Sequence, residues 1–157
     1  MYSTEAELQI QICTFLDIIL PANSIYHHSA NEGRGNKVQF YRKLKRMGFK
    51  AGWPDLEIIT PGSQTLFLEL KRPGNYATIH QKEIHTRLKA AGALVYVCKS
   101  INEVYEALKG VLSIKRHPAA TAMLLHEETM QKDLLRMRSH KRQDKNRKVR
   151  KLKAASI

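Results

Sequence analysis

The sequence has few cysteines and no long apolar run, and both shortages narrow the classes of protein it can encode. Its two cysteines, Cys13 and Cys98, lie in apolar segments without CxxC spacing or a histidine cluster, which argues against a zinc site and favours reduced core residues. No segment approaches the ~20 apolar residues that span a bilayer, and the first residues lack the pattern of a signal peptide. We therefore expect a cytoplasmic protein.

Acidic side chains are also scarce, with 14 Asp and Glu against 27 Lys and Arg and a net charge of +13. Such an excess of positive charge favours a polyanionic partner, and nucleic acid is the leading candidate. The excess is uneven, because residues 1–114 carry 14 basic and 10 acidic side chains whereas residues 115–157 carry 13 and 4. We expect one domain over residues 1–114 and a helical extension with a basic tail over 115–157.

The hydrophobic pattern predicts alternating helices and strands, and hence an α/β protein with a mixed sheet. Residues 4–20 place apolar side chains on one helical face after Thr4 and Glu7, which stand at capping-box spacing. The other expected elements are a strand that runs into a glycine-containing loop over 25–37, a basic helix over 38–47, two strands joined by a turn at 60–64, a helix over 78–91, a strand over 93–98 and a helix over 100–109.

The segment after residue 111 has a different composition. Apolar side chains between Met123 and Met137 would form one stripe of a helix that docks on the core or on another subunit. Residues 138–153 are almost continuously basic, which is typical of a solvated or disordered tail. We expect this tail to attach to DNA without reading its sequence.

Two carboxylates and an amine stand where adjacent strands would present them together. Along residues 66–71, side-chain alternation displays Glu69 and Lys71 on one face, while leucines fill the other. The turn at 60–64 would bring Asp55 close to Glu69. A divalent cation held by carboxylates neutralises charge at a phosphate and supplies a hydroxide-like nucleophile, and hard oxygen ligands favour magnesium or manganese. The pattern therefore favours a metal-dependent phosphodiesterase.

Each of these residues has a simpler interpretation when it is taken alone. Asp55 could be a turn aspartate, and Glu69 with Lys71 could be an exposed cross-strand ion pair. Their combination on a basic chain favours the active-site interpretation. Lys71 could orient or deprotonate the attacking water, or it could stabilise the charged phosphate.

The expected elements follow the order helix, three strands, helix, strand, and the middle hairpin carries Pro54-Asp55 and Glu69-x-Lys71. This arrangement resembles the PD-(D/E)xK nuclease superfamily. Within that superfamily it resembles the VRR-NUC (virus-type replication-repair nuclease) family. The resemblance covers roughly residues 4–108 and rests on four segments: Asn31-Glu32-Gly33-Arg34, Gly48 to Leu56, Phe67 to Lys71, and Gln81 followed by Leu88. It implies a restriction-endonuclease-like core with the order α-β-β-β-α-β.

The resemblance also implies further site residues. Asp55 and Glu69 would bind the metal together with the backbone carbonyl of Leu70 and a carboxylate of the first helix, which falls on Glu7. A glutamine of the helix after the Glu-x-Lys strand falls on Gln81. Glu7 and Gln81 could instead complete capping boxes. Glu32 is a reserve acidic candidate.

Basic side chains before and after the catalytic strands are candidates for contacts with DNA phosphates, although a solvated basic helix face is the usual alternative. The candidates are Arg34, Lys37, Arg42, Arg46 and Arg72. His27, His28, His80 and His85 form no metal-binding spacing and are interpreted as surface or supporting residues. Tyr41, Trp53 and Tyr76 could stack on exposed bases, but Trp53 could equally pack beneath the hairpin.

The resemblance implies a homodimeric DNA endonuclease, selective for branched DNA such as four-way junctions, that acts in phage or bacterial replication and repair. One alternative is a sequence-specific restriction-type nuclease, which needs base-edge contacts that the sequence does not identify. A second is a DNA-binding module that does not cleave, and a third is an RNA-binding protein that depends on its basic tail.

Overall fold

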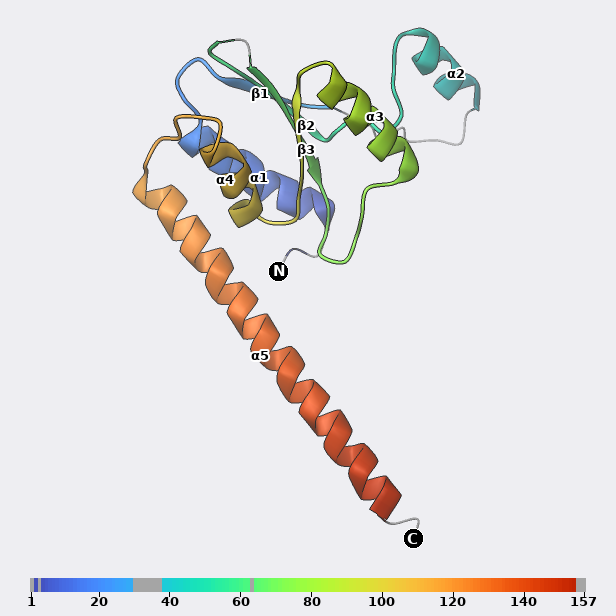
Figure 1. Cartoon of the computed structure of the whole chain (residues 1–157), viewed down its shortest axis with the longest axis vertical. Coiled ribbons are helices and arrows are strands. Elements are labelled where there is room, and N and C mark those ends of the chain that lie inside the picture. Colours follow the sequence, from blue (N-terminus) through green and yellow to red (C-terminus); the bar gives the residue numbers. More distant parts are fainter. Residues whose placement is uncertain (1, 3, 30–37, 63, 155–157) are drawn as a thin grey trace.

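The computed structural model describes residues 2, 4–29, 38–62 and 64–154 (Figure 1). The helices and strands follow the expected order along the chain. They are α1 (Glu5–Ile19), β1 (Ile25–His28), α2 (Val38–Arg46), β2 (Leu56–Thr60), β3 (Gln64–Leu70), α3 (Ile79–Ala90), β4 (Leu94–Cys98), α4 (Ile101–Lys109) and α5 (Pro118–Ala154).

The four strands form one mixed sheet in the order β1-β2-β3-β4. β2 pairs antiparallel with β1 and β3, whereas β4 runs parallel to β3 because α3 connects these two strands. Leu56 is opposite Leu68 in the β2–β3 hairpin, so the next position outward places Asp55 beside Glu69. The predicted mixed α/β sheet and the predicted hairpin are confirmed.

Side-chain caps begin three of the helices where the sequence predicts them. The hydroxyl of Thr4 accepts a hydrogen bond from the Glu7 backbone N–H at the start of α1, and Ser100 accepts one from Glu103 at the start of α4. At the start of α3, Thr78 and Gln81 form a complete capping box.

The hydrophobic core lies between the sheet and the pair of helices α1 and α4. Helix α1 contributes its apolar stripe, which includes Leu8, Ile12 and Phe15, and β3 contributes Leu66 and Leu68. The opposite face of β3 is also buried, because Phe67 and Glu69 are covered on the side of α3. Glu69 and Lys71 are both largely shielded from solvent, so the alternative interpretation of the two as an exposed cross-strand ion pair is wrong.

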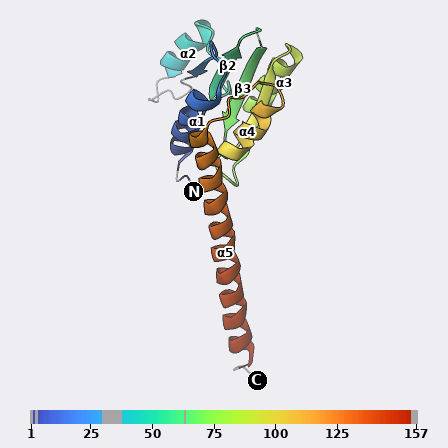
Figure 2. The same cartoon turned by 90° about the vertical axis from the view of Figure 1, so that its left-hand side faces the viewer.

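Helix α5 is a single helix of 37 residues that packs on the body only through its first turns and then extends away from it (Figures 1 and 2). The segment from 138 to 153, expected as a solvated or disordered tail, is helical as far as Ala154. Its lysines and arginines are good helix formers, and it contains neither glycine nor proline to end the helix. The boundary between residues 114 and 115 stays a prediction.

Glu127 attaches α5 to the body. Its side chain is buried, and its Oε1 accepts hydrogen bonds from the Tyr2 hydroxyl (3.0 Å) and the Ile101 N–H (2.9 Å). Its Oε2 accepts from the backbone N–H and the side-chain amide of Asn102, at 2.8 and 2.9 Å. A carboxylate at a helix N-terminus satisfies N–H groups that lack partners within the helix. Glu127 therefore holds α5 against the first turn of α4.

Among the described residues, no helix combines the length and the apolar character needed to cross a membrane.

Candidate active site

Glu69 is the centre of a polar cluster at the carboxyl end of β3. Its side chain is 0% exposed. Its Oε1 accepts hydrogen bonds from Lys71 Nζ at 2.6 Å and from Gln81 Nε2 at 2.5 Å, and its Oε2 lies 3.3 Å from His85 Nε2. A carboxylate removed from water needs such donors, because burial without them is costly.

Asp55 lies beside this cluster at the start of β2. Its Oδ2 accepts a hydrogen bond from the Leu70 N–H at 2.7 Å, which fixes the carboxylate against the end of β3. Its backbone carbonyl accepts from the Ser29 N–H at 3.0 Å and lies 3.0 Å from His28 Nδ1, so β1 also holds this position. The hairpin thus brings Asp55, Glu69 and Leu70 together.

Lys71 directs its ammonium group back into the cluster. Besides the contact with Glu69, Nζ donates to the carbonyl of Leu70 at 3.0 Å and lies 3.8 Å from Glu5 Oε2. Burial would lower the pKa of Lys71, but the hydrogen bond and charge of Glu69, with the charges of Asp55 and Glu5, outweigh it and raise the pKa above its usual value. Lys71 is therefore protonated at neutral pH.

Gln81 performs both of the roles that the sequence offered as alternatives. Its Oε1 accepts a hydrogen bond from the Thr78 N–H at 2.8 Å and completes the cap of α3. Its Nε2 donates to Glu69. The capping geometry turns the amide nitrogen toward the sheet, so one side chain starts the helix and orients the buried carboxylate.

His85, interpreted from the sequence as an ordinary surface or supporting residue, is buried beside Glu69. It lies four residues after Gln81 and therefore on the same face of α3. Burial, together with the charges of Lys89 and Lys71, lowers the pKa of His85, which favours the neutral ring. The i, i+4 spacing after Gln81 is the sequence signal that could have identified it.

The first helix brings Glu5 to the cluster. Besides its proximity to Lys71, Glu5 Oε1 accepts from the Arg72 N–H at 3.3 Å and from the Asn75 side chain at 3.2 Å. Sequence reasoning missed Glu5, although Glu5, Leu8 and Ile12 share one helical face directed at the sheet. Glu7 lines a groove between α1 and α5, and its proposed metal contact stays a prediction.

The cluster carries more negative charge than its own cations offset. Asp55, Glu69 and Glu5 surround one lysine, while His85 is neutral. Burial raises the pKa of Glu69 to about 7, with a further contribution from the charge of Asp55, and the Lys71 hydrogen bond opposes it. Burial likewise raises the pKa of Asp55, against the Leu70 hydrogen bond and the charge of Lys71. A cation placed beside both carboxylates would favour their ionised forms.

This donor set fits a hard divalent cation. Asp55 and Glu69 offer carboxylate oxygens, and the Leu70 carbonyl offers a third oxygen, which are the ligand types that magnesium and manganese prefer. Within the part of the chain that the structure describes, no group of three or more His, Cys, Asp or Glu side chains is arranged to hold a metal ion. A site here would thus depend on the backbone oxygen.

The loop before Asp55 packs closely against the backbone at the start of α3. Gly52 has φ +82°, and a β-carbon at this position would lie 2.8 Å from the carbonyl carbon of His80 and 2.9 Å from the Gln81 nitrogen. Only glycine avoids both the left-handed strain and the collision. Nearby, the Trp53 ring packs edge-on against Phe67 with centroids 5.5 Å apart, in agreement with packing beneath the hairpin.

The described basic residues expected to contact DNA take no part in this cluster. Arg42 and Arg46 are exposed on α2, a peripheral helix with no buried side chain, and Arg72 is exposed just after Lys71. Arg34, Lys37 and the reserve candidate Glu32 fall outside the described residues. Tyr76 is 76% exposed, with Lys99 Nζ 4.6 Å from its ring centroid. Contacts with DNA stay predictions.

Two of the solved structures that are similar to this chain are as follows. One, described as a VRR_NUC domain protein, is 30% identical, with the match covering 66% of this chain and 83% of that one at a TM-score of 0.49. The other, described as a VRR_NUC domain, is 24% identical and covers 65% of this chain and 90% of that one at a TM-score of 0.45. No protein-family model and no curated protein matches the chain.

Proposed function

The chain belongs to the VRR-NUC family, since it is 30% identical to a member over 83% of that member's length, and on this premise we propose that it is a metal-dependent nuclease that hydrolyses DNA phosphodiesters. The observation that carries the proposal is the buried carboxylate of Glu69. It is held by Lys71 and Gln81 beside Asp55, at the open end of the β2–β3 hairpin. The proposal places the core in the PD-(D/E)xK superfamily.

Asp55, Glu69 and the Leu70 carbonyl would hold magnesium or manganese. When bound, the cation supplies charge neutralisation at the phosphate and a nucleophile at neutral pH. The hydrogen bond from the Leu70 N–H fixes one oxygen of Asp55, and Gln81 fixes one oxygen of Glu69. These bonds preorganise the ligands, so little reorganisation is needed on binding.

Lys71 would act as a cation in this mechanism. Its ammonium faces two carboxylates and a carbonyl, which favours the charged form over a free amine. We therefore favour stabilisation of charge on the phosphate over removal of a proton from water. Glu5 would hold Lys71 and the following backbone in place through its contacts with both.

The exposed basic residues would position the substrate. Arg42 and Arg46 on α2 and Arg72 after β3 would contact phosphates, which orient a duplex without reading its sequence. The finer parts of the proposal come from the family resemblance. They are endonucleolytic cleavage selective for branched DNA such as four-way junctions, a homodimer with two active sites, and a role in phage or bacterial replication and repair.

The test is cleavage of linear duplex, flap, single-stranded and four-way-junction DNA with magnesium, with manganese and with EDTA. Glu69→Ala protein serves as the control for a contaminating nuclease. Cleavage that needs the metal and is absent in Glu69→Ala supports the proposal, and preference for the junction supports structure selectivity. DNA binding without metal-dependent cleavage on any substrate would contradict it and leave a DNA-binding module as the function.

A further inference from the structure

One face of α5 lines a groove against α1 and the start of α4. Glu127, Gln131, Leu134 and Arg138 all line this groove, and they recur at intervals of four, three and four residues. Such spacing keeps side chains on one side of a helix. The side of α5 that faces the body thus continues as far as Arg138.

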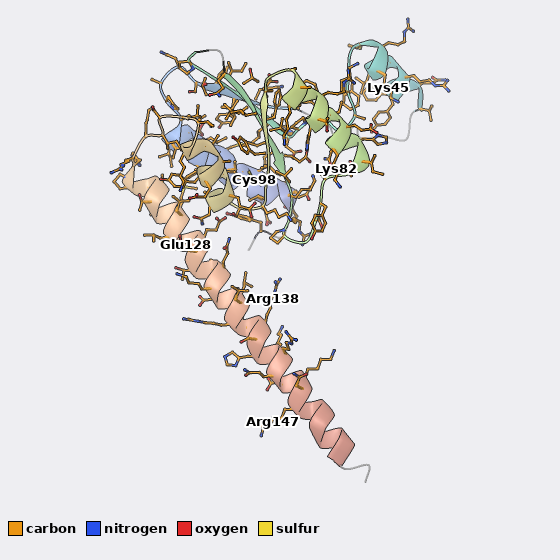
Figure 3. The ribbon with its side chains drawn as sticks, viewed as in Figure 1. Lys45, Lys82, Cys98, Glu128, Arg138 and Arg147 are labelled. Atoms are coloured by element: carbon orange, nitrogen blue, oxygen red, sulfur yellow. The ribbon has the colours of Figure 1, made fainter. Side chains whose placement is uncertain are left out.

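The same face becomes basic beyond the body. Lys141, Arg142 and Lys145 follow Arg138 by three, four and seven residues and share its side of the helix. We call Arg138, Lys141, Arg142 and Lys145 the basic stripe. All four are exposed, and none forms an ion pair with another residue that the structure describes. In Figure 3 no other element lies beside this part of α5.

On the other side of α5, two basic residues have acidic neighbours, unlike those of the basic stripe. Lys132 lies 4.0 Å from Glu128, and Arg136 lies 3.5 Å from Asp133, so each has an acidic neighbour on the helix. Arg147 is nine residues beyond Arg138 and projects from the opposite side (Figure 3). Of the five described basic side chains of α5 without an ion pair, four therefore lie on the side that faces the groove, and Arg147 is the exception.

Like charges three and four residues apart destabilise a helix by repulsion. The basic stripe contains four such pairs and no described acidic partner, so binding to a polyanion would relieve this repulsion. Pro73 and Lys99, which follow the ends of β3 and β4, line the same groove as Arg138. The groove thus connects the edge of the sheet that carries Glu69 and Lys71 with the start of the basic stripe.

We propose that the basic stripe binds the phosphate backbone of duplex DNA and holds the duplex beside the active-site edge of the sheet. This inference rests on the proposed nuclease function for its choice of partner. The stripe spans seven residues, or about 10 Å at 1.5 Å per residue. Each strand carries one phosphate per ~3.4 Å of the duplex axis, so the stripe is as long as the axial rise of about three phosphates.

The shape of α5 favours DNA over double-stranded RNA. A helix about 10–12 Å in diameter fits the ~12 Å major groove of B-form DNA. The major groove of A-form RNA is deep and narrow and does not admit side chains in this way. A helix free of the body over its basic half, as α5 is, can enter such a groove without collision by the domain (Figures 1 and 2).

The test compares two full-length variants with the same change in charge. Arg138→Gln/Lys141→Gln/Arg142→Gln removes three cations of the stripe, and Lys132→Gln/Arg136→Gln/Arg147→Gln removes three from the other side. Affinity for a 30-base-pair duplex is measured by fluorescence anisotropy in EDTA over a series of salt concentrations. Thermal unfolding establishes that both variants are folded.

For the stripe variant we expect the salt slope of log K to fall by about 2.7 and affinity at physiological salt to fall on the order of 100-fold. The control variant should lose less than one unit of slope. Equal losses in both variants, or no loss in the stripe variant, would overturn the inference. Equal competition by double-stranded RNA, or binding to anionic vesicles in place of DNA, would overturn the choice of partner.

The DNA-binding test of the basic stripe can fail or succeed independently of the cleavage test of the proposed nuclease. Binding in EDTA does not require cleavage, so a stripe that binds DNA in a protein without nuclease activity would contradict only the proposed chemistry. Conversely, magnesium-dependent cleavage with salt slopes unchanged in the stripe variant would contradict only the role of α5.

Discussion

Gln81 reaches Glu69 from the first turn of α3, and the amide group that makes this contact also caps the helix. The oxygen accepts from the Thr78 N–H, and the nitrogen donates to the buried carboxylate. The start of α3 and the position of Glu69 therefore depend on one rotamer. Substitutions that remove the cap and those that remove the contact can be separated, because Thr78 takes part only in the cap.

We predict that Gln81→Leu and Thr78→Ala both lower stability, Gln81→Leu by more because it also removes a donor from the buried Glu69 carboxylate, and that they differ in activity. Each removes part of the capping box, which costs ~1 kcal/mol. Only Gln81→Leu removes the donor to Glu69, so only this variant should lose cleavage, by about 10–100-fold, as for other groups that orient metal ligands. Thermal unfolding and initial cleavage rates measure the two effects. Equal activity in the two variants would assign Gln81 to capping alone.

Asp55→Asn and Lys71→Ala should keep the fold and DNA affinity and lose cleavage. Asparagine keeps an oxygen that can accept from the Leu70 N–H but lacks the charge that a divalent cation needs. Removal of Lys71 removes the cation that, in the proposed mechanism, would stabilise charge on the phosphate, at a cost of about 10²–10³-fold in rate. Circular dichroism, anisotropy in EDTA and cleavage in magnesium test the three statements. Normal turnover in either variant would remove the proposed site.

Gly52→Ala should impair both folding and cleavage, whereas Gly48→Ala should affect stability alone. Both glycines have positive φ, so alanine costs about 1–2 kcal/mol at either position. A β-carbon at Gly48 meets no atom within 4 Å, but at Gly52 it collides with the backbone of His80 and Gln81. Displacing that turn moves Gln81 away from Glu69. The two variants are compared by thermal unfolding and cleavage rate, and equal rates would show that the contact at Gly52 does not position the site.

Metal-free protein should lose stability through Glu69 as the pH rises from about 5 to 8. Burial raises the pKa of Glu69 to about 7 from a usual value of 4.5. In this range the folded state binds more protons than the unfolded state, so the free energy of unfolding falls with pH, by on the order of 3 kcal/mol at the upper end. Magnesium should restore stability at pH 8, because it binds the ionised form.

His85 contributes a slope of the opposite sign, since its pKa is lowered and its folded form releases protons. The measurement is therefore the difference in unfolding free energy between wild type and Glu69→Gln, in EDTA and in magnesium. In EDTA, the unfolding free energy of wild type should fall relative to that of Glu69→Gln as the pH rises. Magnesium should reduce this fall. A difference that is constant from pH 5 to 8 would contradict the prediction.

The pairing of Asp55 with Glu69 followed from the sequence, because a turn between two apolar runs of limited length permits only a hairpin. The burial of Glu69 did not follow. Strand alternation specifies which face a side chain occupies, but it gives no information about whether a helix covers that face. Here α3 covers it, so Glu69 and Lys71 lie in an enclosed cluster and do not form an exposed ion pair.

Two assignments on helices show where sequence reasoning stops. The family resemblance placed the first-helix carboxylate on Glu7, whose metal contact stays a prediction, whereas the apolar stripe of α1 also contains Glu5, which lies 3.8 Å from Lys71. The basic segment was interpreted from its charge as a solvated or disordered tail. Its residues are helical, in agreement with their helix propensity.

Because α5 is attached at Glu127, a small rotation there would move the far end of the helix by a large distance. Glu127 is fixed to the first turn of α4, and 27 residues of helix, about 40 Å, separate it from Ala154. A rotation of about 10° at this pivot would carry the tip through about 7 Å, roughly the advance of two base pairs along a duplex. Small adjustments at the α4–α5 contact would thus let one rigid rod follow straight or bent DNA without any change in the catalytic cluster.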